Sequence, residues 1–255
     1  MLIIEKVMLI TTKPQKLRKQ KQQARDIRAF FPRGEFAKSL QDYSTLDANA
    51  NYRSNPHLKV FEYDEETHFL TGINPFVVSR QSELLEDSGR RTAIPSDDQF
   101  GKISALIKGK FYTIFNSPIL LTSGQNDYKI NDNIARDLTE RVEDRRERLP
   151  AMIVNPIVEN WPEDSENYGL RYGLNSKSLV ISDPRLNVRY NGWRFDKVDE
   201  FGLPLFSRNG KRTWHIGKEG ISYLLLDYSL DLYASGVAHA LSFNRGRIIC
   251  VKESK

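Results

Sequence analysis

Carboxylates in the C-terminal part of the chain come nearest to catalytic chemistry. A metal-dependent nuclease needs two or three carboxylates that converge on a Mg²⁺ ion. Asp227 and Asp231 lie four residues apart in an extended run, so they share one face of a strand but are separated by about 13 Å. Asp196 is a further catalytic candidate, which would have to approach from elsewhere. Aspartates are also common on the polar faces of antiparallel strands, so we predict no metal site here.

Basic side chains are concentrated in one segment near the N-terminus. Eight cations stand against Asp26 alone, which gives this segment a net charge of +7 in a chain whose net charge is +5. The eight are Lys13, Lys16, Arg18, Lys19, Lys21, Arg25, Arg28 and Arg33. Such a segment can neutralise phosphates and bind DNA or RNA without sequence preference. A solvated surface, or contact with an acidic protein surface, explains it equally well.

Arginines alternate with aromatic residues in a second candidate binding segment, residues 189–195. Its sequence is Arg-Tyr-Asn-Gly-Trp-Arg-Phe, and Arg189, Trp193 and Arg194 are the candidate nucleic-acid contacts. Aromatic rings beside cations can stack bases of a single strand. The alternative is that these aromatic residues are half-buried packing residues of a strand.

Other motifs for chemistry are missing from the sequence. The four histidines, His57, His68, His215 and His239, are scattered and show no metal-ligand spacing. The chain has no Gly-x-Ser-x-Gly nucleophile motif and no glycine-rich phosphate loop. We therefore expect no metal and no nucleotide cofactor.

The elements that must position these residues begin with a β-rich C-terminal block. Asn209-Gly210 between two extended runs favours a type I′ turn and predicts a hairpin over 203–216. Apolar residues alternate with polar ones over 226–234, which indicates a half-buried strand. A return over 237–243 and a last strand over 247–252 would complete a second hairpin region, 222–252.

About three helices are predicted in the N-terminal half. Pro14 opens a basic helix over 14–31, and the capping pattern Ser96 to Gln99 starts another that breaks near Gly109 or continues to Ile114. The third runs from Asp132 to Leu149, with an apolar stripe of Ile134, Leu138, Val142 and Leu149. Polar loops are expected over 42–56 and 81–95.

This order of elements favours an α+β fold over a doubly wound sheet. One division is a mixed α/β region over 1–158 and a β-rich region over 168–255, with an acidic connector between them. A single domain is the alternative, because the early strands can join the late sheet.

Composition limits the location of the protein. The single cysteine, Cys250, excludes an internal disulfide framework and fits a reducing compartment. The apolar run 2–10 is too short to span a bilayer and lacks the features of a signal peptide. We expect a cytoplasmic protein, or one inside a virus or phage particle, that does not bind membranes.

Three functional hypotheses follow. The leading one is a non-enzymatic component of a nucleoprotein complex or a phage or viral particle, which grips the nucleic-acid backbone or an acidic neighbour. Long polar loops, which neighbouring subunits would hold in place, favour such an assembly. The alternatives are a nucleic-acid-cleaving or -modifying enzyme and a structural particle subunit without nucleic-acid contact.

Overall fold

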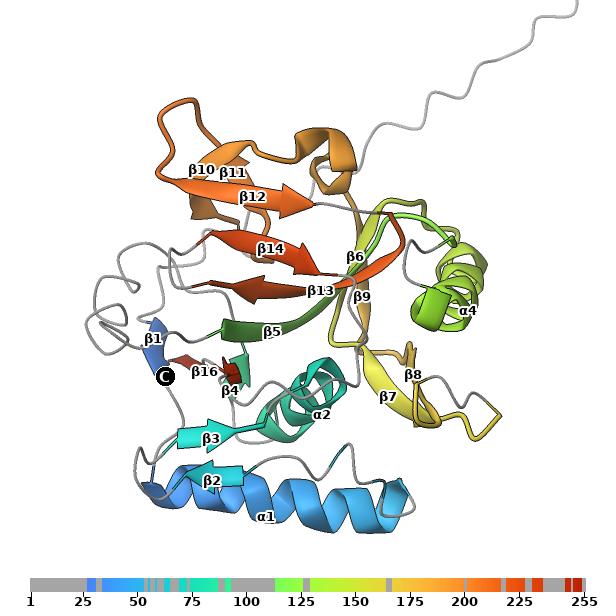
Figure 1. Cartoon of the computed structure of the whole chain (residues 1–255), viewed down its shortest axis with the longest axis vertical. Coiled ribbons are helices and arrows are strands. Elements are labelled where there is room, and N and C mark those ends of the chain that lie inside the picture. The colour runs from blue at the N-terminus through green and yellow to red at the C-terminus, as the bar shows by residue number, and fades with distance from the viewer. Residues whose placement is uncertain are drawn as a thin grey trace, which may run out of the picture.

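The computed structural model (Figure 1) describes residues 27–30, 34–52, 55, 58, 62–64, 69–72, 74–86, 90–92, 113–125, 129–163, 167–199, 201–216, 219–227, 231–235, 246–248 and 250–253. Several predicted features lie outside these residues. They are the basic segment up to Arg25 together with Arg33, most of the helix predicted from Ser96, and the strand predicted over 237–243.

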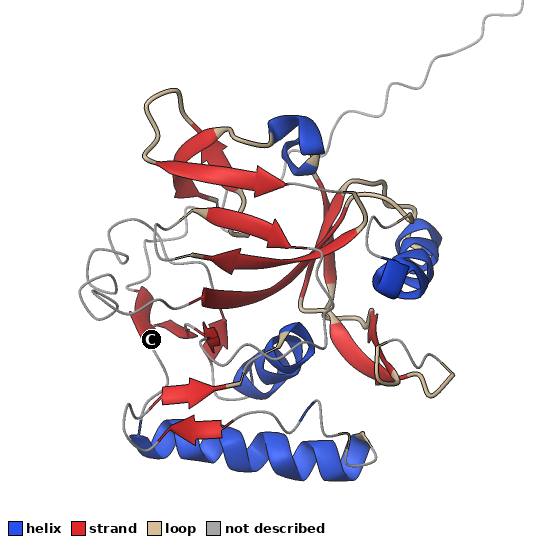
Figure 2. Ribbon diagram, viewed as in Figure 1, coloured by secondary structure: helices blue, strands red, loops and turns tan. Residues whose placement is uncertain are grey.

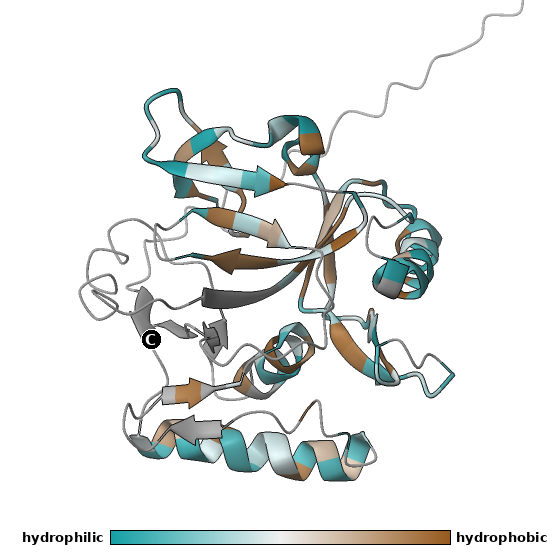
Figure 3. Cartoon of the chain, in the orientation of Figure 1, coloured by the Kyte–Doolittle hydropathy of each residue, from teal (hydrophilic) through white to brown (hydrophobic). Residues whose placement is uncertain are grey.

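A nine-stranded sheet forms the body of the described structure. Its order is β11-β10-β12-β14-β13-β5-β6-β9, with β15 paired to β5 beside this path. The strands are β5 (Thr113–Leu121), β6 (Ala151–Val154), β9 (Leu179–Ser182), β10 (Arg194–Val198), β11 (Pro204–Phe206), β12 (Arg212–Ile216), β13 (Ile221–Leu226), β14 (Leu232–Ser235) and β15 (Gly246–Ile248). Most neighbours are antiparallel, whereas β12 with β14 and β15 with β5 are parallel. The interior strand β13 is largely hydrophobic (Figure 3), as burial on both faces requires.

Apolar side chains are buried on both faces of this sheet. On β5, Ile119 and Leu121 belong to one buried cluster and Leu120 to the other, because successive strand residues point to opposite faces. The first cluster also contains residues of the α-helices. The second contains Phe195 and Trp214 from β10 and β12. The strands β10, β11 and β12 lie at the end of the molecule opposite α1 (Figures 1 and 2).

Three α-helices pack in the first cluster: α1 (Gly34–Asn51), α2 (Pro75–Glu86) and α4 (Asp132–Asp144). Three residues of the predicted stripe, Ile134, Leu138 and Val142, lie in α4 and are fully buried, whereas Leu149 lies beyond its end. The helix ends five residues before the predicted Leu149. There Arg146 takes a left-handed φ of 61° and its N–H bonds back to the carbonyl of Glu143, a common way for a helix to stop.

Smaller elements complete the described structure. A three-stranded sheet consists of β1 (Ile27–Phe30), β16 (Cys250–Glu253) and β4 (Arg90–Thr92). Two pairs of strands are β2 (Glu62–Asp64) with β3 (Phe69–Thr71) and β7 (Ile157–Asn160) with β8 (Leu170–Gly173). The 3-10 turns are η2 (Lys129–Asn131), η3 (Pro184–Leu186) and η4 (Val188–Tyr190). The predicted α+β class is confirmed. The α-helices that the structure describes lie mostly in the N-terminal half, and a curled, mostly antiparallel sheet fills the C-terminal half.

The hairpin predicted over 203–216 is wrong. A turn does form there, because the N–H of Gly210 bonds to the carbonyl of Ser207 at 3.2 Å. However, β11 and β12 do not pair with each other: β10 lies between them and pairs antiparallel with both. Asn209 and Gly210 also lack the positive φ that a type I′ turn requires. The two strands that the turn joins are separated by a third, so a tight hairpin geometry is not needed.

The second predicted hairpin region, 222–252, is corrected in its details. The chain is not one strand over 226–234: β13 ends at Leu226, and β14 begins at Leu232 and returns antiparallel to it. The backbone N–H of Asp227, directly after β13, donates to the carbonyl of Asp231, directly before β14. Strands are present within 247–252, although they belong to two different sheets.

Two N-terminal predictions are also corrected. The basic helix predicted over 14–31 cannot extend to its expected end, because β1 is a strand that pairs antiparallel with β16. The loops predicted over 42–56 and 81–95 begin inside helices, since α1 continues to Asn51 and α2 to Glu86. In α1, Leu40, Ser44 and Ala48 recur every four residues and are buried, so tertiary packing favours a helix despite the polar composition.

The main sheet takes β5 and β6 from the region 1–158 and its other strands from 168–255. The acidic connector between these regions is the loop of the antiparallel β7–β8 pair. Whether the chain divides into two domains there stays a prediction.

Candidate nucleic-acid interface

The segment 189–195 lies at the end of the main sheet formed by β10, β11 and β12. Asn187 begins η4, because its side-chain oxygen accepts a hydrogen bond from the backbone N–H of Arg189 at 3.0 Å. Gly192 then turns the chain with a φ of 79°, a conformation that glycine adopts without steric cost. Its N–H donates to the carbonyl of Trp214 on β12 at 2.8 Å, which anchors the segment to the sheet.

Trp193 is held at its backbone and open at its side chain. Its N–H donates to the carbonyl of Tyr190 at 3.1 Å, and its carbonyl accepts from the N–H of Trp214 at 2.9 Å. The side chain is 49% exposed, whereas Trp214 is fully buried. The local fold therefore presents one large aromatic ring to solvent in a defined position.

Two further rings join Trp193. Tyr190 and Phe206 are stacked, with their centroids 5.5 Å apart and an interplanar angle of 10°. Trp193 stands across both, with its ring centroid 4.7 Å from that of Tyr190 and 5.2 Å from that of Phe206. The interplanar angle to Phe206 is 63°, so the two rings form a corner. Edge-to-face contacts of this kind stabilise aromatic clusters.

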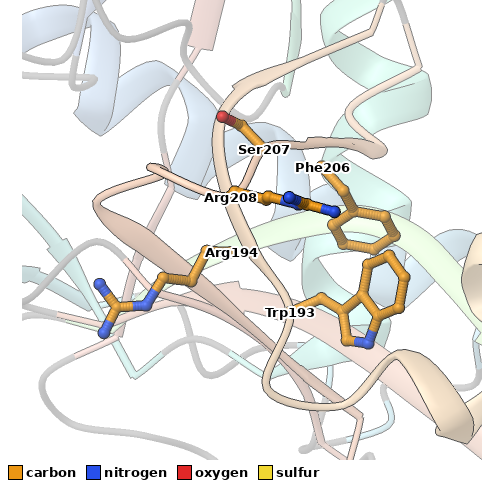
Figure 4. Close-up of a pocket in the computed structure, with 5 residues that line it drawn as sticks. All are labelled: Trp193, Arg194, Phe206, Ser207 and Arg208. Atoms are coloured by element: carbon orange, nitrogen blue, oxygen red, sulfur yellow. The ribbon is translucent and has the colours of Figure 1, made fainter.

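A hollow of about 350 Å³ opens beside this corner (Figure 4). It is lined by Trp193, Arg194, Phe206, Ser207 and Arg208. The N–H of Ser207 donates to the carbonyl of Arg194 at 2.9 Å, which connects the two strands that supply these residues. In Figure 4 the guanidinium of Arg208 projects toward the ring of Phe206, while that of Arg194 points away from Trp193.

Three exposed arginines surround the aromatic cluster. The guanidinium of Arg189 lies 4.9 Å from the centroid of the Tyr190 ring and donates to the Tyr190 hydroxyl at 3.1 Å. Arg194 donates to the carbonyl of Gly210 at 3.5 Å, and Arg208 is exposed beside it. Arginine stacks on aromatic faces and binds phosphate in a bidentate manner, so this surface combines both modes of contact with nucleic acid.

The carboxylate nearest in sequence is already engaged by the backbone. Asp196 on β10 accepts a hydrogen bond from the N–H of Lys211 at 2.8 Å. It therefore helps to fix the turn between β11 and β12, which carries Arg208.

Arg185 connects the segments that position the strands beside the hollow. Its guanidinium binds Asp183 at 2.6 Å and Asp199 at 2.7 Å, and it donates to the carbonyl of Pro204 at 3.0 Å. Burial raises the pKa of the Asp183 carboxyl, but hydrogen bonds from Arg185 and its positive charge outweigh burial, so this pKa is lowered overall. Arg185 thus joins η3 to the start of β11, one strand that supplies the hollow.

Gly210 allows the turn between β11 and β12 to lie against β10. A Cβ atom at this position would lie 2.4 Å from the backbone nitrogen of Phe195 and 2.7 Å from its Cα. Only a residue without a side chain fits there, which explains the glycine in the Asn209-Gly210 pair.

The structure brings together three of the predicted nucleic-acid contacts, Arg189, Trp193 and Arg194. Of the basic segment it describes Arg28, which lies on β1. Phe206 and Arg208 were missed, because sequence reasoning assigned them to the hairpin with β12. The pairing of Phe195 with Phe206 places them beside Trp193, and no short-range signal indicates that pairing.

The candidate carboxylates do not form the predicted arrangement. Asp227 and Asp231 do not share one strand, as the spacing of about 13 Å required, because Asp227 follows β13 and Asp231 precedes β14. The N–H of Asp231 donates to the carboxylate of Asp227 at 3.1 Å. Asp231 in turn accepts from the N–H of Thr213 at 2.6 Å, with His215 Nε2 3.7 Å away. In the part of the chain that the structure describes, no three Asp, Glu, His or Cys side chains are grouped as a metal site would need.

Comparison of the chain with protein-family models, with curated proteins and with solved structures finds no significant similarity. Within the described residues, no helix combines the length and apolar character needed to cross a membrane.

Proposed function

We propose that the protein is a non-enzymatic component that binds nucleic acid at the surface around Trp193. One observation carries the proposal: three exposed arginines, Arg189, Arg194 and Arg208, belong to the same surface as a half-exposed tryptophan that the backbone holds in place. Arginines neutralise phosphates and release the counterions condensed on the nucleic acid. The aromatic rings supply contact area that does not depend on charge.

The basic segment between Lys13 and Arg33 supports the same proposal from the sequence. Its net charge of +7 would supply further phosphate contacts in a complex. An acidic protein surface is the competing partner for this segment.

Binding is favoured over cleavage because the candidate carboxylates have structural tasks. Asp196 and Asp231 each accept a hydrogen bond from a backbone N–H on β12 or the turn before it. A carboxylate in such a bond orders the fold, whereas a metal-dependent nuclease needs its carboxylates directed at a common ion.

The setting of this activity is part of the proposal. A chain with a single cysteine suits a reducing compartment, so we place the protein in the cytoplasm or inside a particle, with other protein subunits as partners. Long polar loops give less support to an assembly than the sequence indicated, because α1 and α2 occupy part of both segments.

Binding of labelled oligonucleotides about 16 nucleotides long, followed by fluorescence anisotropy, tests the proposal. Affinity should fall steeply as salt rises from about 50 to 200 mM, and Arg194→Ala with Arg208→Ala should flatten the slope by about two phosphate contacts. The matched control is Arg136→Ala with Arg148→Ala, which removes two exposed cations of α4 and the loop after it. Failure to bind any oligonucleotide at low salt would overturn the proposal.

A further inference from the structure

The hollow beside Trp193 is built for a flat ligand. Trp193 and Phe206 meet at 63° with their ring centroids 5.2 Å apart, so a planar ring stacked on one of them would meet the other edge-on. Both arrangements are favourable for aromatic pairs. With a volume of about 350 Å³, the hollow is at the small end of the range for ligand pockets.

The site is organised before any ligand arrives. Backbone hydrogen bonds hold Trp193 on both sides, yet half of its side chain faces solvent. Because little conformational freedom remains to be lost at this backbone, a stacked ligand would bind with a small entropic cost.

The rim of the hollow identifies the charge of the ligand. Arg194 and Arg208 are exposed cations that line it together with the hydroxyl-bearing Ser207. An aromatic side chain of a partner protein would use the rings but not the cations. A nucleobase that carries phosphates uses both.

We propose that this hollow takes an unpaired base of a single-stranded nucleic acid, with the adjoining phosphates on Arg194 and Arg208. The inference rests on the proposed function and adds the class of nucleic acid that is bound. In a duplex the faces of the bases are covered by their neighbours, so neither ring of the corner can stack on them. A single strand presents bases that are free to stack on aromatic side chains.

The test compares a single strand, the corresponding duplex and a strand of equal length and charge that has abasic sites. The single strand should bind roughly 5- to 150-fold more tightly than the abasic strand, the range for stacking of one base. Trp193→Ala should abolish this difference and leave the salt slope unchanged, because the cations remain. Trp193→Phe should keep part of it.

Tyr43→Ala, which removes an exposed aromatic ring on α1, is the matched control and should keep the full preference. Circular dichroism of Trp193→Ala checks that the substitution at this exposed position has not changed the fold. Quenching of tryptophan fluorescence by the single strand, lost in Trp193→Phe, would support direct stacking.

The other outcomes overturn the inference in distinguishable ways. Equal affinity for the single strand, the duplex and the abasic strand would contradict base stacking but would still agree with phosphate binding. A mononucleotide that binds as tightly as the strand would show that a free nucleotide is the ligand. If none of these probes binds, both the stacking of a base and the proposed function are contradicted.

Discussion

Asp231 has a structural role that its position in the sequence does not reveal. It lies directly before β14 and accepts a hydrogen bond from the N–H of Thr213, which lies directly before Trp214, the first residue of β12 that pairs with β14. The carboxylate thus continues the hydrogen bonding of the parallel β12–β14 pair by one step. A residue that looks catalytic by type is used here to begin a strand.

Replacement of Asp231 by alanine should therefore destabilise the fold. We expect a loss of about 1.5–3 kcal/mol in the free energy of unfolding, the range for a hydrogen bond to a charged group. Asp231→Asn keeps an acceptor oxygen and should lose less than half as much. Urea unfolding measures both, and Glu140→Ala, at an exposed position on α4, should stay within about 0.5 kcal/mol of the parent protein. Equal stability of Asp231→Ala and the parent would contradict this role.

Asp183 makes the stability depend on pH. Because Arg185 lowers the pKa of this carboxyl in the folded protein, the ionised form is favoured by folding. The contribution of the ionised carboxyl to the free energy of unfolding is present above the unfolded-state pKa of about 3.9. It is lost as the pH falls through the lower pKa of the folded state.

Asp183→Asn should therefore be less stable than the parent protein near neutral pH. The difference should narrow as the solution is acidified below pH ~4, where the parent carboxyl also becomes neutral. Urea unfolding at a series of pH values measures this difference. A difference that stays constant down to the lowest pH at which the protein folds would show that the Asp183 charge does not matter.

At the scale of elements, strand order determines what the Asn209-Gly210 turn does. The turn joins β11 to β12, but β10 occupies the place between them. Sequence periodicity locates extended segments well, because side-chain alternation is local. It does not determine which segment lies beside which, since pairing depends on the contacts of distant residues.

Gly210→Ala tests this arrangement. The added Cβ would press on the backbone of Phe195, which cannot move without disturbing β10. We expect a loss of about 1–3 kcal/mol, as for other overpacked sites. Thermal or urea unfolding measures it.

Asn209→Ala is the control, since Asn209 is exposed in the same turn and should cost no more than about 0.5 kcal/mol. If β11 and β12 formed a simple hairpin, the Cβ atom added by Gly210→Ala would not contact β10. A small loss of stability in Gly210→Ala would therefore support a simple hairpin instead.

At the scale of the whole molecule, the end of the chain joins parts that are far apart in the sequence. β16 lies between β1 and β4 (Figure 1). β15 pairs with β5 in the main sheet. Two sheets therefore each take a strand from 246–253.

Deletion of residues 246–255 should destabilise the protein as a whole. It removes the shared neighbour of β1 and β4 and the parallel partner of β5. Since each backbone hydrogen bond contributes about 1 kcal/mol net, we expect a loss of at least about 3 kcal/mol and a Tm lowered by roughly 6–12 °C. Deletion of residues 254 and 255 alone, beyond the end of β16, is the control and should leave Tm unchanged. Calorimetry would contradict the prediction if both deletions gave the same Tm.

The sequence by itself determined the α+β class, the apolar stripe of the helix from Asp132, and the association of arginine with aromatic residues over 189–195. These features follow from local spacing, which decides which side chains share a face of one element. The sequence also indicated a turn at Asn209-Gly210.

Only the tertiary structure decided that β10 separates β11 from β12, that Phe206 and Arg208 lie beside Trp193, and that Asp227 and Asp231 are hydrogen-bonded to each other between two strands. Each of these depends on contacts between residues from different elements. Such contacts are chosen by the burial of the whole core and by the hydrogen bonding of distant strands, neither of which leaves a periodic signal in the chain.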